Sequence, residues 1–335
     1  MILHCMHKKK TITAVILCLL VTIITGLFPL AALTGCAGKA TQKETRTAFY
    51  LNTVVSITLY EKNPDDLFDH CMELLDSYDN MLSRTKEYSD IWNINHSDGA
   101  TVTVQPETAE LLSIALSYAE MSEGLVDPTI GTLTTLWNFG DSNQGIVPSD
   151  AEIKEALSHV DYRNVVLEGN EVTLKDPDAM LDLGFIAKGY IADSLKEYLI
   201  SCQVESAIIN LGGNVLTIGK RPDGTPFQVG VQKPFADSGT AALTLSIEDK
   251  SLVSSGNYER FFIKDDVLYH HILSTENGYP ADSGLSSVTI ISENSVDGDA
   301  LSTLCFILGY EKGKKLTDSL QGVEAVFIDK NGTVL

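Results

Sequence analysis

The sequence has few basic residues and few cysteines for its length. Its 335 residues include 24 lysines and arginines against 45 aspartates and glutamates, so the formal net charge at pH 7 is −21. This acidity argues against nucleic acid as a partner, because phosphate backbones would be repelled. The cysteines stand singly and without metal-ligand spacing. Beyond residue 36 only Cys71, Cys202 and Cys305 remain, so at most one disulfide could form.

The chain also lacks internal repeats, and its long apolar run lies at the N-terminus. Lysines at positions 8–10 precede an uncharged apolar stretch, residues 11–33, which is typical of a secretory signal. The residues Leu33-Thr34-Gly35-Cys36 resemble a bacterial lipobox. We therefore predict a signal peptide at 1–35, palmitate-type lipid on Cys36, a polar tether at 36–47, and a lipoprotein on the cell membrane that faces outside the cytoplasm. The alternative is an uncleaved transmembrane anchor.

Residues 48–335 are predicted to form one domain, because they alternate strand and helix patterns and suffice for a hydrophobic core. The predicted fold class is α+β, with mixed, largely antiparallel sheets flanked by helices. We expect helices at 65–82, 106–122, 149–158, 299–308 and 312–321, with Ser149 as an N-cap. Strands are expected at 49–60, 165–167, 172–174, 206–211, 215–218, 227–231, 241–247, 252–254, 260–263 and 286–291, with hairpin turns at Gly169-Asn170 and Asn331-Gly332.

The segment 182–190 carries the strongest local signal. It places Asp182, two glycines and Lys188 between an apolar lead-in and residues that repeat at helical spacing. Lys188 therefore falls at a helix start, where free N–H groups and the helix dipole favour an anion such as phosphate. The alternative is an ordinary turn in which Gly184 and Gly189 serve the backbone and Lys188 is solvated.

Further segments must be read together with this one. In order they are Leu51-Asn52-Thr53, Tyr88-Ser89-Asp90-Ile91, Gly124-Leu125-Val126-Asp127-Pro128-Thr129, Asn210-Leu211-Gly212-Gly213-Asn214, Ser254-Ser255-Gly256-Asn257-Tyr258 with His270-His271 after it, and Asp299-Ala300-Leu301-Ser302-Thr303. The ordered set resembles the ApbE-type FAD:protein FMN transferases from Phe49 to the C-terminus, and it is more specific than any single motif.

Asp299 and Thr303 are the candidate metal ligands. They lie four residues apart at the start of an apolar helix, so a carboxylate and a hydroxyl share one face. Oxygen ligands of this kind suit Mg²⁺. Taken alone, the pair would be read as an N-cap and a core threonine. The resemblance implies magnesium, held also by the backbone carbonyl of Ala187.

The resemblance also implies the contacts to FAD, the substrate. It assigns them to Leu51, Tyr88, Leu125, Val126, Asp127, Asp182, Lys188 and Ile272. Core packing is the alternative for Tyr88, Leu125 and Val126, and turn chemistry is the alternative for Asp127 before Pro128.

His271 is the candidate for proton transfer, with Lys188 as the second catalytic residue. A histidine accepts a proton near neutral pH, and the family pattern places it immediately before an isoleucine, here Ile272. The adjacent His270 would point to the opposite face of a strand. The alternative is a structural histidine.

The resemblance implies magnesium-dependent transfer of FMN from FAD to a threonine of a separate extracytoplasmic acceptor, a flavin-carrying protein of membrane redox complexes, with release of AMP. Leu51-Asn52 and Ser274-Thr275 depart from the family's usual methionine-glycine and aspartate-proline. These departures leave open a magnesium-dependent FAD pyrophosphatase. A flavin-binding lipoprotein without turnover is the third possibility, against which the paired Asp299 and Thr303 argue.

Overall fold

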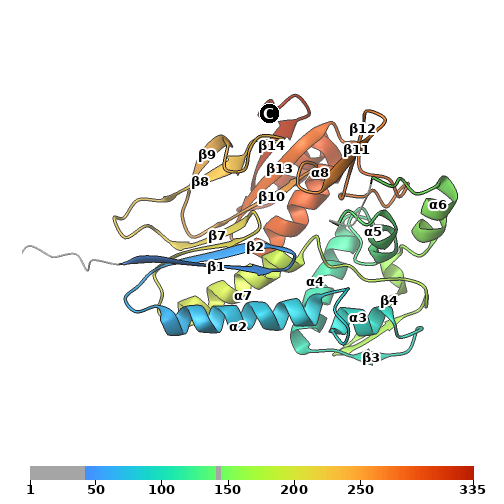
Figure 1. Ribbon diagram of the computed structural model, residues 1–335, viewed down its shortest axis with the longest axis horizontal. Helices are drawn as coiled ribbons and strands as arrows, with labels where there is room; N and C mark the ends of the chain where they lie inside the picture. Colours follow the sequence, from blue (N-terminus) through green and yellow to red (C-terminus); the bar gives the residue numbers. More distant parts are fainter. Residues whose placement is uncertain (1–41, 141–144) are drawn as a thin grey trace, which may run out of the picture. The chain divides into compact units, whose positions relative to one another are not determined.

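The computed structural model describes residues 42–140 and 145–335. The predicted signal peptide, Cys36 and most of the predicted tether lie outside these residues. Within them, no helix combines the length and apolar character needed to cross a membrane. The helices of the described residues (Figure 1) are α2 (Asp65–Leu82), α3 (Asp90–Asn95), α4 (Pro106–Met121), α5 (Gly131–Trp137), α6 (Asp150–Ser158), the short 3₁₀ helix η1 (Tyr162–Asn164), α7 (Ala187–Ser201) and α8 (Ser295–Ser319).

A large antiparallel sheet organises the domain. Its strand order is β1-β2-β6-β7-β10-β13-β14, and each neighbouring pair is antiparallel. These strands are β1 (Lys43–Tyr50), β2 (Thr53–Tyr60), β6 (Ser206–Leu211), β7 (Asn214–Gly219), β10 (Ser251–Gly256), β13 (Leu285–Ser292) and β14 (Glu324–Asp329). Small sheets are formed by β3 (Val102–Thr103), β4 (Val165–Glu168) and β5 (Glu171–Leu174), by β8 (Phe227–Gln232) and β9 (Ala241–Ile247), and by β11 (Phe261–Lys264) and β12 (Val267–His270). The predicted α+β class with largely antiparallel pairing is confirmed.

Helices α2 and α7 run alongside the sheet (Figure 1). Buried apolar side chains from both helices and from β2, β6 and β7 form one core cluster, with Leu75, Leu195 and Ile209 among its members. A second cluster joins Phe306 of α8 to Val288 of β13. Burial of this apolar surface stabilises the sheet and fixes α7 and α8 against it.

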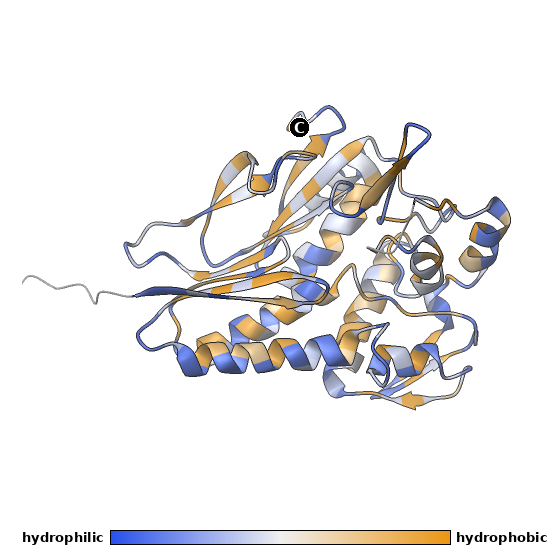
Figure 2. Cartoon of the chain, in the orientation of Figure 1, coloured by the Kyte–Doolittle hydropathy of each residue, from blue (hydrophilic) through white to orange (hydrophobic). Residues whose placement is uncertain are grey.

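The N-terminal prediction needs a correction. Residues 43–47, which we assigned to the tether, form the first half of β1, and the single strand expected at 49–60 is the end of β1 plus β2. Figure 2 shows why the sequence misled: this first half of β1 is hydrophilic. The strands join through Leu51 and Asn52, both with φ 55°, as a two-residue hairpin turn requires.

The predicted helices are otherwise close to those observed. Ser149 caps α6, and the Ser149 and Glu152 side chains each accept a hydrogen bond from the other's backbone N–H. Helix α8 begins at Ser295, earlier than predicted, and Gly309 with φ 77° interrupts it between the two helices that we expected. Two short helices, α3 and α5, were not predicted.

The predicted turns are confirmed at β4–β5 and near the C-terminus, where the Gly332 N–H donates to the Asp329 carbonyl. Gly212 and Gly213 have positive φ in the tight turn between β6 and β7. A side chain at Gly212 would lie 2.6 Å from Cγ2 of Thr53, so this turn also packs on the start of β2. Among the described residues, Cys71, Cys202 and Cys305 are free thiols.

Candidate active site

The site is built where the N-termini of α7 and α8 meet. Gly189, in the first turn of α7, packs against the first turn of α8. A Cβ atom at Gly189 would lie 2.6 Å from Cα of Val296 and would press on the Ser295 carbonyl. The second glycine of the motif is therefore required by a close approach of two backbones rather than by its own φ angle.

Asp299 joins these two helices. Its Oδ2 accepts a hydrogen bond from the Gly189 N–H at 2.9 Å, and its Oδ1 lies 3.4 Å from the Lys188 ammonium. Asp299 is 3% exposed. Burial raises the pKa of Asp299, and the neighbouring positive charge of Lys188 opposes that rise. The structure thus brings Lys188 and Asp299, two candidate site residues that lie 111 positions apart in the sequence, into contact.

Thr303 lies one helical turn beyond Asp299 on α8. Its hydroxyl is 3.1 Å from the hydroxyl of Ser255, on β10, which is also 2.8 Å from the Ser302 hydroxyl. Ala187, the third predicted ligand, is the first residue of α7. A carboxylate, a hydroxyl and a carbonyl are hard oxygen donors, and the Lys188 ammonium already occupies a cation's place beside Asp299. This donor set therefore fits Mg²⁺.

A different group of metal-type side chains lies elsewhere in the described chain. It consists of His159, Asp176 and Asp178, and its closest pair is His159 Nδ1 and Asp176 Oδ2 at 2.8 Å. None of the predicted ligands belongs to this group, so it does not bear on the magnesium prediction.

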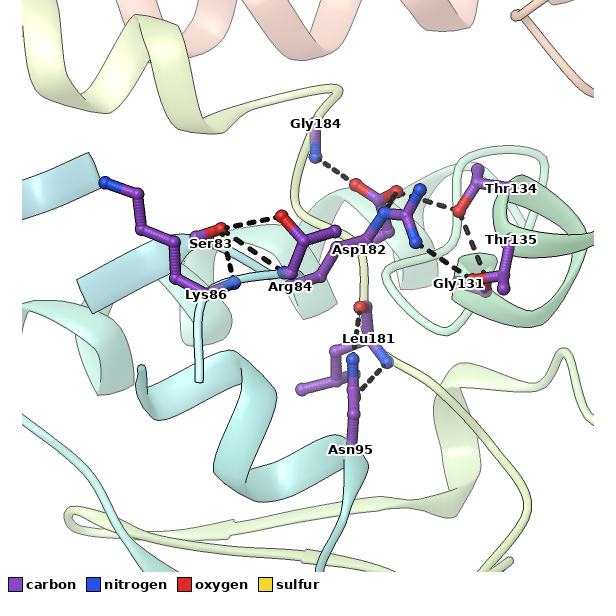
Figure 3. Close-up of polar contacts among 11 residues, drawn as sticks. Ser83, Arg84, Lys86, Asn95, Gly131, Thr134, Thr135, Leu181, Asp182 and Gly184 are labelled. Carbon is purple, nitrogen blue, oxygen red and sulfur yellow. Dashed lines mark hydrogen bonds and ion pairs between the residues drawn. The ribbon is translucent and has the colours of Figure 1, made fainter. Parts of the chain in front are cut away.

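Asp182 connects three segments at the entrance to α7 (Figure 3). Its Oδ1 accepts the Gly184 N–H at 2.8 Å. Its Oδ2 accepts the Thr134 hydroxyl at 2.8 Å and lies 3.0 Å from Nε of Arg84. Arg84 also donates to the Thr135 hydroxyl at 2.9 Å. Asp182 therefore orders the loop before Lys188, and most of its hydrogen-bonding capacity is already used within the protein.

Asp127 lies in a buried turn. Its Oδ1 accepts the Thr129 N–H at 2.8 Å and the Thr129 hydroxyl at 2.6 Å, and its Oδ2 accepts the Tyr162 N–H at 2.8 Å. Burial raises the pKa of Asp127, and these hydrogen bonds oppose the rise. Val126 and Asp127 are both buried, and Asp127 lines the floor of a surface cleft together with Leu125 and Thr275.

The two adjacent histidines differ in their surroundings. The His270 ring is bonded on both sides: Nε2 is 3.2 Å from the Ala281 carbonyl, and Nδ1 accepts the Ile272 N–H at 3.3 Å. Nδ1 of His271 has no hydrogen-bond partner among the described residues. Burial, aided by the charge of Arg260, lowers the pKa of His271 to about 3, so its ring is neutral at pH 7. Ile272 is buried next to them.

Asp79 links the β1–β2 turn to the segment that leads to Tyr88. The Leu51 N–H donates to Asp79 Oδ1 at 3.1 Å, and Lys86 binds the other Asp79 oxygen at 2.5 Å. Tyr88, two residues further on, has φ 69° and is 81% exposed. A bulky residue with positive φ carries strain, and such strain is concentrated at functional sites.

The neighbours of Tyr88 have structural roles. The Ser89 side chain caps α3 by accepting the Trp92 N–H at 2.9 Å. Asp90 Oδ2 accepts the Gln105 N–H and the Thr108 hydroxyl at 2.8 and 2.7 Å, which anchors the start of α4.

Sequence reasoning missed Arg84 and Glu259. Arg84 belongs to no segment of the ordered set, and its partner lies almost a hundred residues away. Glu259 directly follows the Ser254–Tyr258 segment, and this position is the signal by which the sequence could have identified it. The surrounding protein raises the pKa of Glu259 by desolvating its carboxylate, and the positive charges of Lys188 and Arg260 oppose that rise.

The departures at Ser274 and Thr275 have local explanations. The Ser274 hydroxyl accepts the Glu276 N–H at 3.2 Å, as an aspartate in this position could. The Thr275 hydroxyl donates to the Gly124 carbonyl at 2.8 Å, which ties the segment after His271 to the segment containing Leu125.

The fold and these motifs define a protein of the flavin transferase type. Residues 51–327 match the ApbE family. The chain is 37% identical over 292 residues to an FAD:protein FMN transferase of Klebsiella pneumoniae, covering 86% of this chain and 90% of the relative. It is 35% identical over 314 residues to the FAD:protein FMN transferase of Treponema pallidum, covering 88% and 86%. The crystal structure of the ApbE protein of Thermotoga maritima superposes with a TM-score of 0.81 at 34% identity, covering 88% of this chain and 96% of that one.

The chain belongs to the ApbE family, which confirms the resemblance identified from the ordered motifs.

Proposed function

We propose that this chain is an FAD:protein FMN transferase that moves FMN from FAD to a threonine hydroxyl of an acceptor protein and releases AMP. The observation that carries the proposal is the contact between Lys188, at the start of α7, and Asp299 of α8, which lies one helical turn before Thr303. The Lys188 ammonium can bind a phosphate group, and the relatives that share this family carry the transferase name.

In this proposal the threonine oxygen bonds to the FMN phosphorus while the phosphoanhydride bond of FAD breaks. AMP leaves with the electron pair of that bond. Lys188 stabilises the negative charge on the phosphates, as pre-positioned cations do in phosphoryl transfer. Its 3.4 Å contact with Asp299 keeps the ammonium at the helix start.

His271 receives the proton of the attacking hydroxyl. Its ring is neutral at pH 7, and its Nδ1 lacks a partner in the described protein, so it can take part in a hydrogen bond with the acceptor. A pKa of about 3 makes a weak base. Phosphate charge nearby raises the pKa of an imidazole, so FAD itself strengthens this base.

Asp299, Thr303 and the Ala187 carbonyl would hold magnesium. When bound, the ion neutralises charge on the pyrophosphate of FAD. Leu51, Tyr88, Leu125, Val126, Asp127, Asp182 and Ile272 contact FAD in this proposal. Asp182 and Asp127 contribute mainly by ordering their loops, since their oxygens already accept hydrogen bonds from the protein.

The acceptor is a separate extracytoplasmic protein that carries flavin in a membrane redox complex. Lipid on Cys36 would keep the enzyme on the outer side of the cell membrane, next to such complexes. Radiolabelled palmitate incorporated by the wild-type chain but not by Cys36→Ala would support this location, and equal labelling would contradict it.

The test of the proposal is the variant Asp299→Ala, assayed for FMN attached to acceptor, free FMN and AMP. We expect FMN transfer and AMP release to fall at least about 100-fold, because the variant loses the ligand that also binds Lys188. Unchanged transfer would refute the role of this cluster. If the wild-type protein releases AMP and only free FMN, it is the pyrophosphatase; if it releases neither, it is the flavin binder.

A further inference from the structure

Helix α8 begins without a side-chain cap of its own. Its N-cap residue, Asn294, makes no such hydrogen bond. The first two N–H groups instead donate to Asp193 of α7: Ser295 to Oδ1 and Val296 to Oδ2, each at 2.8 Å. A carboxylate there satisfies donors that the helix cannot and complements the positive end of its dipole.

Helix α7 is capped in return by α8. Its own N-cap residue, Ile186, has an apolar side chain and makes no capping bond. Asp299 supplies the missing acceptor for Gly189 at 2.9 Å. Asp193 and Asp299 therefore form a reciprocal pair of caps, in which each helix provides the carboxylate for the other.

The two caps act at one helix crossing. Gly189 lies four residues before Asp193 on α7, and Ser295 lies four residues before Asp299 on α8. The close approach at Gly189 leaves no room for either helix to slide toward the other. A change at Asp193 would therefore free the start of α8 and move Asp299 relative to Lys188.

We propose that Asp193 is a positioning residue of the metal and pyrophosphate site, acting through the N-terminus of α8. This inference rests on the proposed function, in which Asp299 and Thr303 bind the cation. Asp193 itself touches neither ligand side chain. Its effect is to fix the rotation and height of the helix that carries both, and displacement by about 1 Å is enough to impair such a site.

The test uses Asp193→Asn in the full chain. One amide N–H₂ group would then face a backbone N–H, so one of the two caps is lost. Mn²⁺ is titrated into the nucleotide-free protein, and free Mn²⁺ is followed by its EPR signal. We expect Mn²⁺ affinity to fall about tenfold or more. Wild-type Mn²⁺ affinity in Asp193→Asn would overturn the inference.

Ser149→Ala is the matched control, because it removes the cap of α6, which carries none of the predicted ligands. It should lower the melting temperature by a comparable amount and leave Mn²⁺ affinity within about twofold. An equal loss of Mn²⁺ affinity in Ser149→Ala would also overturn the inference, since general destabilisation would then explain the result.

Asp299→Asn separates the two proposals. If this variant binds Mn²⁺ normally, the metal site itself is wrong and the inference about Asp193 falls with it. If Asp299→Asn loses Mn²⁺ and Asp193→Asn does not, the metal site stands and only the positioning role is refuted.

Discussion

Replacing Gly189 by alanine tests most sharply how the two helices build the site. The added methyl would lie 2.6 Å from Cα of Val296. Carbon atoms in contact need about 3.5–4.0 Å, so α7 and α8 must separate by about 1 Å. The obstructing atoms are backbone, and a rotamer change in α8 cannot move them aside.

Overpacking of this kind costs about 1–3 kcal/mol of unfolding free energy. In a domain of this size we expect the melting temperature to fall by roughly 2–10 °C. The same separation stretches the hydrogen bond between the Gly189 N–H and Asp299, so the rate of FMN transfer should fall about 100-fold. Calorimetry and the transfer assay measure the two effects on one preparation.

Gly140→Ala is the control, because among the described residues a Cβ there would meet only Asn138 Oδ1, at an ordinary 3.5 Å. It should change neither quantity appreciably. Wild-type melting temperature and wild-type transfer in Gly189→Ala would refute the reasoning, since the helices would then have room that the structure does not show.

Three further variants have defined outcomes. Leu51→Asn should raise the unfolding free energy by about 1 kcal/mol in urea titrations, because asparagine tolerates the left-handed angle at this turn. The same variant should weaken FAD binding, because it removes the apolar side chain that we propose contacts FAD; tighter FAD binding would contradict this. Lys188→Met should lower FMN transfer at least about 100-fold, and a KM effect alone would argue against a role in charge stabilisation. His270→Gln should reduce the fall in unfolding free energy that urea titrations show as the pH is lowered from 6.5 to about 4. An unchanged pH dependence would contradict the argument that burial keeps His270 neutral.

The sign of the His270 effect follows from its pKa, which burial lowers from 6.5 to about 4. Below pH 6.5 the unfolded histidine takes up a proton, while the folded one stays neutral until about pH 4. The unfolded state therefore binds more protons in this range, and the unfolding free energy falls as the pH falls. The contribution is about 3 kcal/mol between these limits.

Local patterns in the sequence predicted the elements that depend on neighbours along the chain. Ser149 and Glu152 marked the start of α6 because a capping box needs only four consecutive residues. The helical spacing of the apolar residues after Lys188 likewise marked the start of α7. The family pattern assigned Asp299 and Lys188 to one site, since no local rule brings two distant helix starts together, but their direct contact was not predicted.

The misses arise where tertiary contacts override local preference. Leucine rarely adopts a left-handed angle, so Leu51 masked the turn, and Asn52 was the one local signal of it inside the stretch predicted as one strand. The hydrogen bond that the Leu51 N–H donates to Asp79 Oδ1 holds that turn. Arg84 reaches Asp182 across the fold, and Asp193 caps a helix a hundred residues away. Such partners follow from packing and have no periodic signature in sequence.

The most direct test of the account is to incubate the protein with FAD, magnesium and a flavin-acceptor domain, then examine a denaturing gel for flavin fluorescence while AMP is measured. The account predicts fluorescence that stays with the denatured acceptor, one AMP released per flavin attached, and loss of both on chelation of magnesium. AMP accompanied only by free FMN across the acceptors tried, or attachment that persists without magnesium, would contradict it.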